Sequence, residues 1–217
     1  FRDITERKKA EEALERIDKV RIKEIHHRIK NNLQIISSLL DLQAEKFEDE
    51  NVIEAFREGQ NRVSSMSLIH EELYRGEGTD TLDFSAYLKK LAENLFKTYN
   101  LSNKDIHLKM DLEEETFLDM DTAVPLGIIV NELVSNSLKH AFPDREKGEI
   151  RIKLYRKEKN SETNMSLFSL IISDDGKGLP EDLELESAES LGLQLVNILV
   201  DQLDGELALK RNNGIEF

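Results

Sequence analysis

The sequence predicts a helical hairpin followed by a two-layer α/β sandwich. Residues 1–75 contain no proline and a single glycine, Gly59, and their apolar residues recur three and four positions apart. That spacing is typical of amphipathic helices. Beyond residue 80 the pattern changes to short alternating segments between further helices, which indicates a mixed or antiparallel sheet covered by helices.

The first 75 residues predict two helices. A polar break at residues 47–51 separates their apolar stripes, and two helices with a short polar link form a hairpin. Because one hairpin buries little apolar surface, we expect a homodimer through residues 21–78 that forms a four-helix bundle. A hairpin packed on its own C-terminal domain is the alternative. The stripes consist of Ile22, Ile25, Ile29, Leu33, Ile36 and Leu40, and of Val52, Phe56, Val63, Met66 and Leu73.

The second domain starts after a glycine-rich turn at residues 76–80. Residues 83–99 predict a helix with Asp83 as N-cap, and residues 122–141 a helix with Pro125 in its first turn. A further helix is expected at 191–203, with strands at 106–112, 150–155, 166–173, 206–210 and 215–217. The predicted organisation is a signalling helix or linker at 1–20, the hairpin at 21–78, and the α/β domain at 79–217, its last strand truncated.

Composition excludes several classes of function. The net charge of -14 argues against nucleic-acid binding, and the absence of cysteine excludes disulfides and fits a reducing cytoplasm. No apolar window reaches the ~18 residues of a membrane span, so no membrane contact is expected from this chain. The scattered histidines predict no structural zinc site. Without an initiator Met, the chain is expected to be a piece of a longer cytoplasmic protein, either soluble or membrane-attached.

Two neighbouring histidines lie on the first helix. At about 100° per residue, His26 falls near the apolar stripe and His27 points nearly opposite, on the same face as Glu24 and Asn31. On geometry alone, a packed His26 and a solvated His27 need no function.

Two polar clusters stand out in the second domain. Glu132, Asn136, Lys139 and His140 recur at helical spacing, and burying them beside a sheet is costly without a polar ligand. An ordinary exposed polar face is the alternative. The run D-D-G-K-G-L-P from Asp174 ends a buried strand in a sharp turn.

These motifs together resemble a known family. The run E-I-H-H-R-I-K-N-N-L-Q from residue 24 is similar to the phosphoacceptor helix of histidine kinases with an H-R-x-K-N signature, related to the HWE kinases. Residues 65–74 resemble their second hairpin helix. Residues 131–140, 174–180 and 190–196 resemble the N, G1 and G2 boxes of the ATPase domain shared by gyrase and histidine kinases. The resemblance covers residues 15–217.

The resemblance implies a sensor histidine kinase that phosphorylates its own His27 and passes the phosphoryl group to an aspartate of a response-regulator receiver domain. Arg28 stands where the commonest kinases place an acid, so Glu24 or Glu132 is expected to assist. Asn31 stands where a polar residue positions water in kinases that are also phosphatases.

The same resemblance implies ATP and Mg²⁺ as cofactors. Asn136 would bind Mg²⁺ through its amide oxygen, and Lys139 and His140 would contact phosphate. Glu132 would polarise the attacking group or hold a magnesium-bound water, beside Asn131.

At the base end, Asp174 would accept a hydrogen bond from the adenine amino group, while Gly176 and Gly178 let the backbone approach. Gly192 and Leu193 would open a helix whose N–H groups meet phosphate, after an ATP lid at residues 179–190. The second glycine of the usual pair is absent, and Ile215 replaces the threonine of the family's G-T-x-F end.

Residues 1–12 resemble the exit of a PAS sensor domain, which predicts such a domain upstream. Three other functions stay open: an ATPase that only hydrolyses ATP, a degenerate kinase acting as a scaffold, and a serine kinase with a related ATP domain. The His27 helix argues against the first, and the presence of Asn136, Asp174, Gly176 and Gly178 argues against the second.

Overall fold

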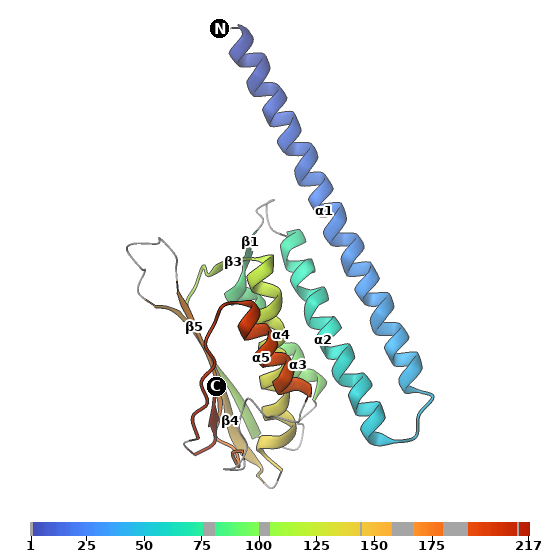
Figure 1. Ribbon diagram of the computed structural model, residues 1–217, viewed down its shortest axis with the longest axis vertical. Coiled ribbons are helices and arrows are strands. Elements are labelled where there is room, and N and C mark those ends of the chain that lie inside the picture. The colour runs from blue at the N-terminus through green and yellow to red at the C-terminus, as the bar shows by residue number, and fades with distance from the viewer. Residues whose placement is uncertain are drawn as a thin grey trace. The chain divides into compact units, whose positions relative to one another are not determined.

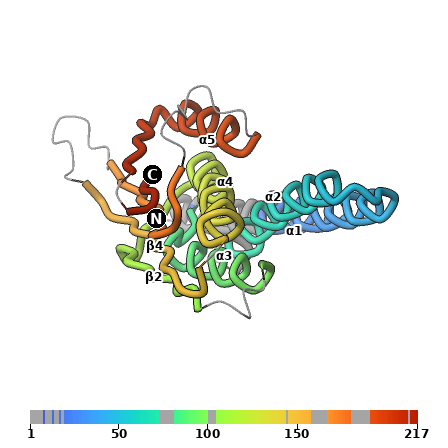
Figure 2. The backbone as a smooth tube through the Cα atoms, turned by 90° about the horizontal axis from the view of Figure 1, so that it is seen from below, coloured from blue at the N-terminus to red at the C-terminus, as the bar shows by residue number. Residues whose placement is uncertain are grey.

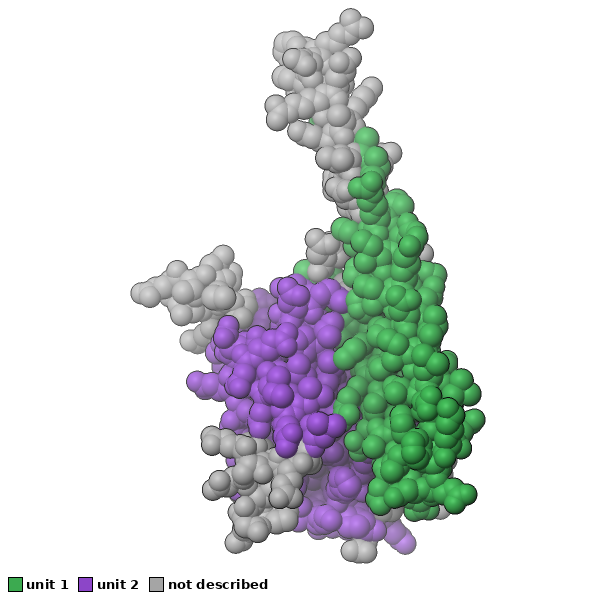
Figure 3. Space-filling model, turned by 45° about the vertical axis from the view of Figure 1, so that its right-hand side comes forward, with its two compact units in different colours: residues 1–82 green, residues 83–217 purple. Residues whose placement is uncertain are grey.

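The computed structural model describes residues 2–75, 81–99, 105–143, 145–157, 167–179, 191–211 and 213–217. They form two compact units, residues Phe1–Leu82 and Asp83–Phe217, which are coloured separately in Figure 3. The predicted boundary turn at 76–80 and residues 180–190 of the predicted lid lie outside the described residues.

The first unit is a hairpin of α1, Arg2–Ala44, and α2, Glu50–Arg75 (Figure 1). The Asp49 carboxylate accepts a hydrogen bond from the Asn51 N–H at 2.8 Å, which caps the first turn of α2. Near the connection, the rings of Phe47 and Phe56 stack with centroids 5.6 Å apart. The predicted hairpin is confirmed. No described helix has an apolar stretch long enough to cross a bilayer.

The second unit is a two-layer α/β sandwich, as predicted. Its main sheet has the order β2-β4-β5-β6, in which β2 and β4 are parallel and the other pairs antiparallel. Its helices lie on one face of this sheet (Figures 1 and 2). The elements are β1 Thr81–Asp83, α3 Phe84–Thr98, β2 Asp105–Leu112, β3 Phe117–Asp119, α4 Met120–Asn136, the π-helical turn η1 Ser137–Ala141, β4 Lys147–Arg156, β5 Phe168–Asp174, α5 Leu191–Gln202 and β6 Ile215–Glu216.

The core of this unit lies between the sheet and its helices. Alternate residues of β4 are buried, and Ile152 pairs in register with Ile172 of β5. Val130 and Val134 of α4 are fully buried, as are Tyr87 and other side chains of α3. Each such side chain contributes roughly 1.5–3 kcal/mol by leaving water, which fixes α4 firmly on the sheet.

The ends of several elements test the sequence analysis. Asp83 is the N-cap of α3, as predicted, and its carboxylate accepts from the N–H groups of Ser85 and Ala86. The placement of Pro125 in the first turn is wrong: Asp119 caps α4 and the helix begins at Met120, so Pro125 lies in its second turn.

The strand predicted at residues 206–210 is also wrong. Only Lys210 forms a bridge, to Glu216, because β6 has just two residues and offers no longer ladder. The strands β1 and β3, three residues each, pair only with one another and were not predicted. Strands of that length carry no alternation that a sequence pattern can detect.

Candidate functional site

The last turns of α4 carry the first cluster of polar residues. Asn131 and Glu132 are 2% and 6% exposed, and the Asn131 amide donates to the Glu132 carboxylate at 3.2 Å. Asn136 follows one turn after Glu132 and is half-buried. Two amides and a carboxylate in this setting offer oxygen atoms to a polar ligand.

The first turn of α5 meets this cluster. A Cβ added at Gly192 would lie 2.7 Å from Oε2 of Glu132 and 3.9 Å from Nδ2 of Asn136. Leu193 is buried beside it and anchors the turn. The amino end of a helix, with its free N–H groups and positive dipole, therefore lies against the carboxylate, a suitable place for phosphate and cation together.

A second cluster surrounds Asp174 at the end of β5. The Ser137 hydroxyl donates to Oδ2 at 2.6 Å and the Gly176 N–H donates to Oδ1 at 3.0 Å. Burial raises the pKa of the Asp174 carboxyl, and these two donors act against that rise. Ser137 was not among the predicted site residues. Its signal in the sequence was a hydroxyl directly after Asn136.

The turn after Asp174 packs on the π-helical turn η1. A Cβ at Gly176 would lie 2.5 Å from the carbonyl oxygen of Ala141, and the Lys177 N–H donates to that oxygen at 2.9 Å. Gly178 has φ +79°, a left-handed conformation that favours glycine. Both glycines therefore meet a backbone requirement of this turn.

Gly214, the glycine of the G-T-x-F end, also belongs to this cluster but was not among the predicted site residues. It has φ +123°, and a Cβ there would lie 1.9 Å from the Asp174 carbonyl oxygen. The C-terminal hairpin thus lies directly against the backbone of Asp174. Only glycine allows that approach.

Lys139 and His140 lie in η1, where the spacing is wider than in an α-helix. The Lys139 ammonium lies 5.6 Å from the centre of the Tyr99 ring, and His140 is exposed. The sequence analysis expected Asn136, Lys139 and His140 on one helix face, which requires 3.6 residues per turn. The α-helix with that spacing ends at Asn136.

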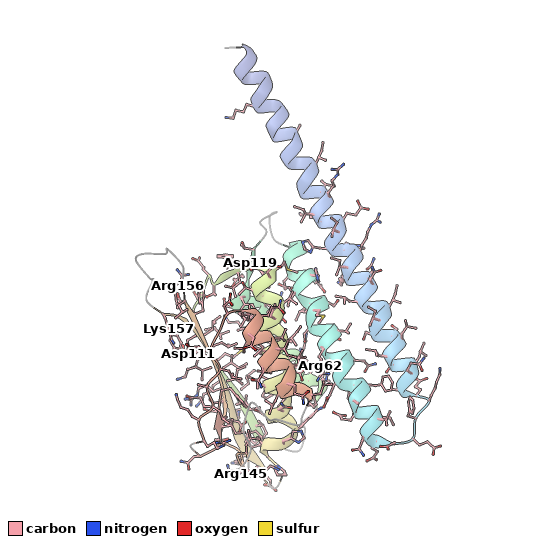
Figure 4. The ribbon with its side chains drawn as sticks, viewed as in Figure 1. Arg62, Asp111, Asp119, Arg145, Arg156 and Lys157 are labelled. Carbon is pink, nitrogen blue, oxygen red and sulfur yellow. The ribbon has the colours of Figure 1, made fainter. Side chains whose placement is uncertain are left out.

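Asp175, the neighbour of Asp174, has a structural role. Its carboxylate accepts from the Glu149 N–H at 2.7 Å, and its carbonyl accepts from Arg145, labelled in Figure 4, at 2.5 Å. The two adjacent acids are thereby separated: Asp175 ties the turn to β4, and Asp174 belongs to the buried cluster.

On α1, His27 is exposed, as the helical geometry predicted, and its Nδ1 lies 3.3 Å from the Asn31 amide nitrogen. The structure does not place Glu24 on His27. Both described hydrogen bonds to the Glu24 carboxylate come from Arg28, at 2.6 and 3.2 Å. His26 turns instead toward α2, where its Nδ1 meets that of His70 at 3.0 Å.

Two protein families match this chain. A family described as "Histidine kinase" matches residues 24–99, and the "Histidine kinase-, DNA gyrase B-, and HSP90-like ATPase" family matches residues 121–217. The chain belongs to the histidine kinases. The α/β unit of this histidine kinase contains an ATP-binding domain, and the other match includes the hairpin from residue 24 onward.

Relatives of this histidine kinase are themselves sensor kinases. The sensor histidine kinase PdtaS of Mycobacterium tuberculosis is 35% identical over 214 residues, which are 97% of this chain and 40% of that protein. Blue-light-activated histidine kinase 2 of Erythrobacter litoralis is 28% identical over 193 residues, 87% of this chain and 52% of that protein. The chain thus spans about half or less of these relatives.

Among solved structures, the histidine kinase domain of the Erythrobacter litoralis EL346 blue-light activated kinase matches with a TM-score of 0.66 and 26% identity. The match covers 91% of this chain and 88% of that one. Both the hairpin and the α/β unit are thus within the matched fold.

Proposed function

We propose that this chain transfers the γ-phosphoryl group of ATP to His27 and then to an aspartate of a separate response-regulator receiver domain. In the first step the lone pair of a neutral imidazole nitrogen attacks the γ-phosphorus. The bond from that phosphorus to the bridging oxygen breaks, and ADP leaves with its electron pair. The exposed His27 on the family's histidine helix is the observation that carries the proposal.

Asn31 can set which nitrogen attacks. The Asn31 amide nitrogen lies 3.3 Å from Nδ1 of His27. When the amide is turned so that its oxygen faces the ring, that oxygen accepts a hydrogen bond from Nδ1–H. The lone pair is then on Nε2, which becomes the nucleophile, and the Nδ1 proton passes to water after transfer. Because Arg28 pairs with Glu24, we assign no proton transfer to Glu24.

The two clusters of the α/β unit divide the nucleotide between them. Asp174, held by Ser137 and Gly176, is proposed to accept from the adenine amino group. Glu132, Asn136 and the amino end of α5 are proposed to face the phosphates.

Mg²⁺ fits the first cluster, at the end of α4, by donor chemistry. The Asn136 amide and the Glu132 carboxylate provide oxygen ligands, and Mg²⁺ takes its remaining ligands from water and phosphate. Among the described residues, no three His, Cys, Asp or Glu side chains are grouped so that they could hold a metal ion. When bound, it would neutralise phosphate charge.

The hairpin is proposed to form a homodimer through residues 21–78. Apolar side chains of α1 remain between 38% and 59% exposed, a large cost for a helix in water. A second hairpin covers such stripes in a four-helix bundle. The side chains are Ile22, Ile25, Ile35, Ile36, Leu39 and Leu42.

The test is autophosphorylation with ATP radiolabelled in the γ position, comparing the wild type with His27→Gln and His26→Gln. Acid-labile label that is lost in the His27 variant and kept in the His26 variant supports the proposal. Label lost only in the His26 variant would move the acceptor. Failure of the wild-type chain to bind ATP would refute kinase activity of this chain.

A further inference from the structure

His26, the residue before His27, forms a hydrogen bond with His70 that connects α1 to α2. Their Nδ1 atoms are 3.0 Å apart, and the ring centres 5.2 Å apart. A hydrogen bond between two ring nitrogens needs one N–H and one lone pair. Only one of the two facing nitrogens can therefore carry a proton while the bond exists.

Charged groups of both signs lie near this pair. On α1, Lys23 and Lys30 lie one turn to either side of His26, and on α2 two acids follow His70. The nearer acid, Glu71, is already paired with Lys30 at 2.8 Å. The charged groups near the pair on the two helices are Lys23, Lys30, Glu71 and Glu72.

The partial burial of His70 disfavours its protonation. Burial first, and then the neighbouring His26, lower the pKa of His70 below its ordinary 6.5. Folding therefore favours neutral His70. The stability it contributes is complete above about pH 6.5 and is lost as the pH falls below that value toward the folded pKa.

We propose that His70 is a positioning residue for phosphotransfer: through its hydrogen bond to His26 it fixes the rotation of α1 that presents His27, and acid releases this hydrogen bond once both facing Nδ1 atoms carry a proton. This inference rests on His27 being the phosphoacceptor. His26 and His27 are consecutive on one helix, so a rotation that breaks the first contact turns the second side chain as well. The hairpin would then lose activity in acid for two separate reasons, the effect of acid on the transfer step and the loss of the position of His27.

Two substitutions of His70 separate these reasons. In His70→Asn the amide occupies the place of Nδ1 and keeps a hydrogen bond to His26, but does not titrate. In His70→Leu the hydrogen bond is lost. Initial autophosphorylation rates between pH 5.5 and 8, with radiolabelled ATP and saturating Mg²⁺, give the profiles.

We expect His70→Asn to match the wild type at pH 8, and His70→Leu to be slower by about three- to tenfold, the worth of one hydrogen bond. At pH 5.5 His70→Asn should exceed the wild type about threefold or more, because its hydrogen bond to His26 does not depend on a proton on residue 70. Coincident profiles for the wild type and His70→Asn would overturn the inference, as would an unimpaired His70→Leu at pH 8. Label retained in a parallel His27→Gln sample would instead refute the proposed acceptor.

Discussion

Replacing Asp174 with asparagine removes a buried charge while keeping both hydrogen bonds that hold the side chain. The Gly176 N–H donates to Oδ1 at 3.0 Å and requires an oxygen there, so the amide nitrogen takes the place of Oδ2. The Ser137 hydroxyl lies 2.6 Å from that place and can turn to accept from the new NH₂ group. The variant is therefore expected to fold with this side chain in position.

Two free energies then change in opposite directions. Because burial raises the pKa of Asp174 above its unfolded value of 3.8, its contribution to stability is complete below that pH and is lost as the pH rises through the folded pKa. At pH 7.5 the charge costs about 1.4 kcal/mol per unit of that rise, so Asp174→Asn should unfold at higher temperature without nucleotide. ATP binding loses its carboxylate acceptor, about 1.5–3 kcal/mol, or roughly 10- to 150-fold in Kd.

Calorimetric titration with Mg²⁺ and a non-hydrolysable ATP analogue measures the second effect, and thermal unfolding of the empty protein measures the first. Asp175→Asn is the matched control, because its carboxylate bonds the Glu149 N–H rather than the cluster. It should leave the Kd within about twofold. An unchanged Kd in Asp174→Asn would refute the adenine contact, and a lower unfolding temperature would refute the cost of burying the charge.

Three further substitutions test the packing. Gly192→Ala places a methyl group 2.7 Å from the Glu132 carboxylate and should lower the autophosphorylation rate at least about tenfold by displacing it; a rate equal to wild type contradicts this contact. Gly59→Ala, inside α2, is its control and places a methyl 3.7 Å from Leu40 of α1, so the free energy of unfolding measured in urea should rise by about 0.5–1 kcal/mol with the rate unchanged. Ser135→Ala removes the buried hydroxyl that has no hydrogen-bond partner among the described residues and should stabilise the protein by about 1 kcal/mol; a fall in the midpoint would reveal a partner.

Local patterns predicted most of the fold. The apolar periodicity of residues 22–40 and the cap at Asp83 each depend on a few neighbouring residues, so the sequence shows them directly. The strand expected at 206–210 has suitable alternation but lacks a partner of matching length. Ladder formation is a property of two segments, and alternation in one cannot establish it.

The candidate site could likewise be predicted only in part. The residue types at Asn136, Asp174 and Gly192 could be selected from their motifs, whereas the contacts that join them could not. The Ser137–Asp174 hydrogen bond connects residues 37 positions apart, and the approach of Gly192 to Glu132 joins two helices. Contacts between residues so far apart along the chain depend on tertiary packing, which local spacing does not reveal.

The π-helical turn at the end of α4 sets how this helix contacts both α5 and the glycine turn after Asp174. A π turn corresponds to one residue inserted into an α-helix, and such insertions persist mainly at functional sites. Before it, α4 presents Glu132 to α5; after it, the Ala141 carbonyl meets the Lys177 N–H. Deleting that one residue would rotate everything after it by about 100° and pull the helix end out of register with the glycine turn, while leaving the preceding helix intact. The two halves of the proposed nucleotide site are thus kept in phase by the length of the chain between them.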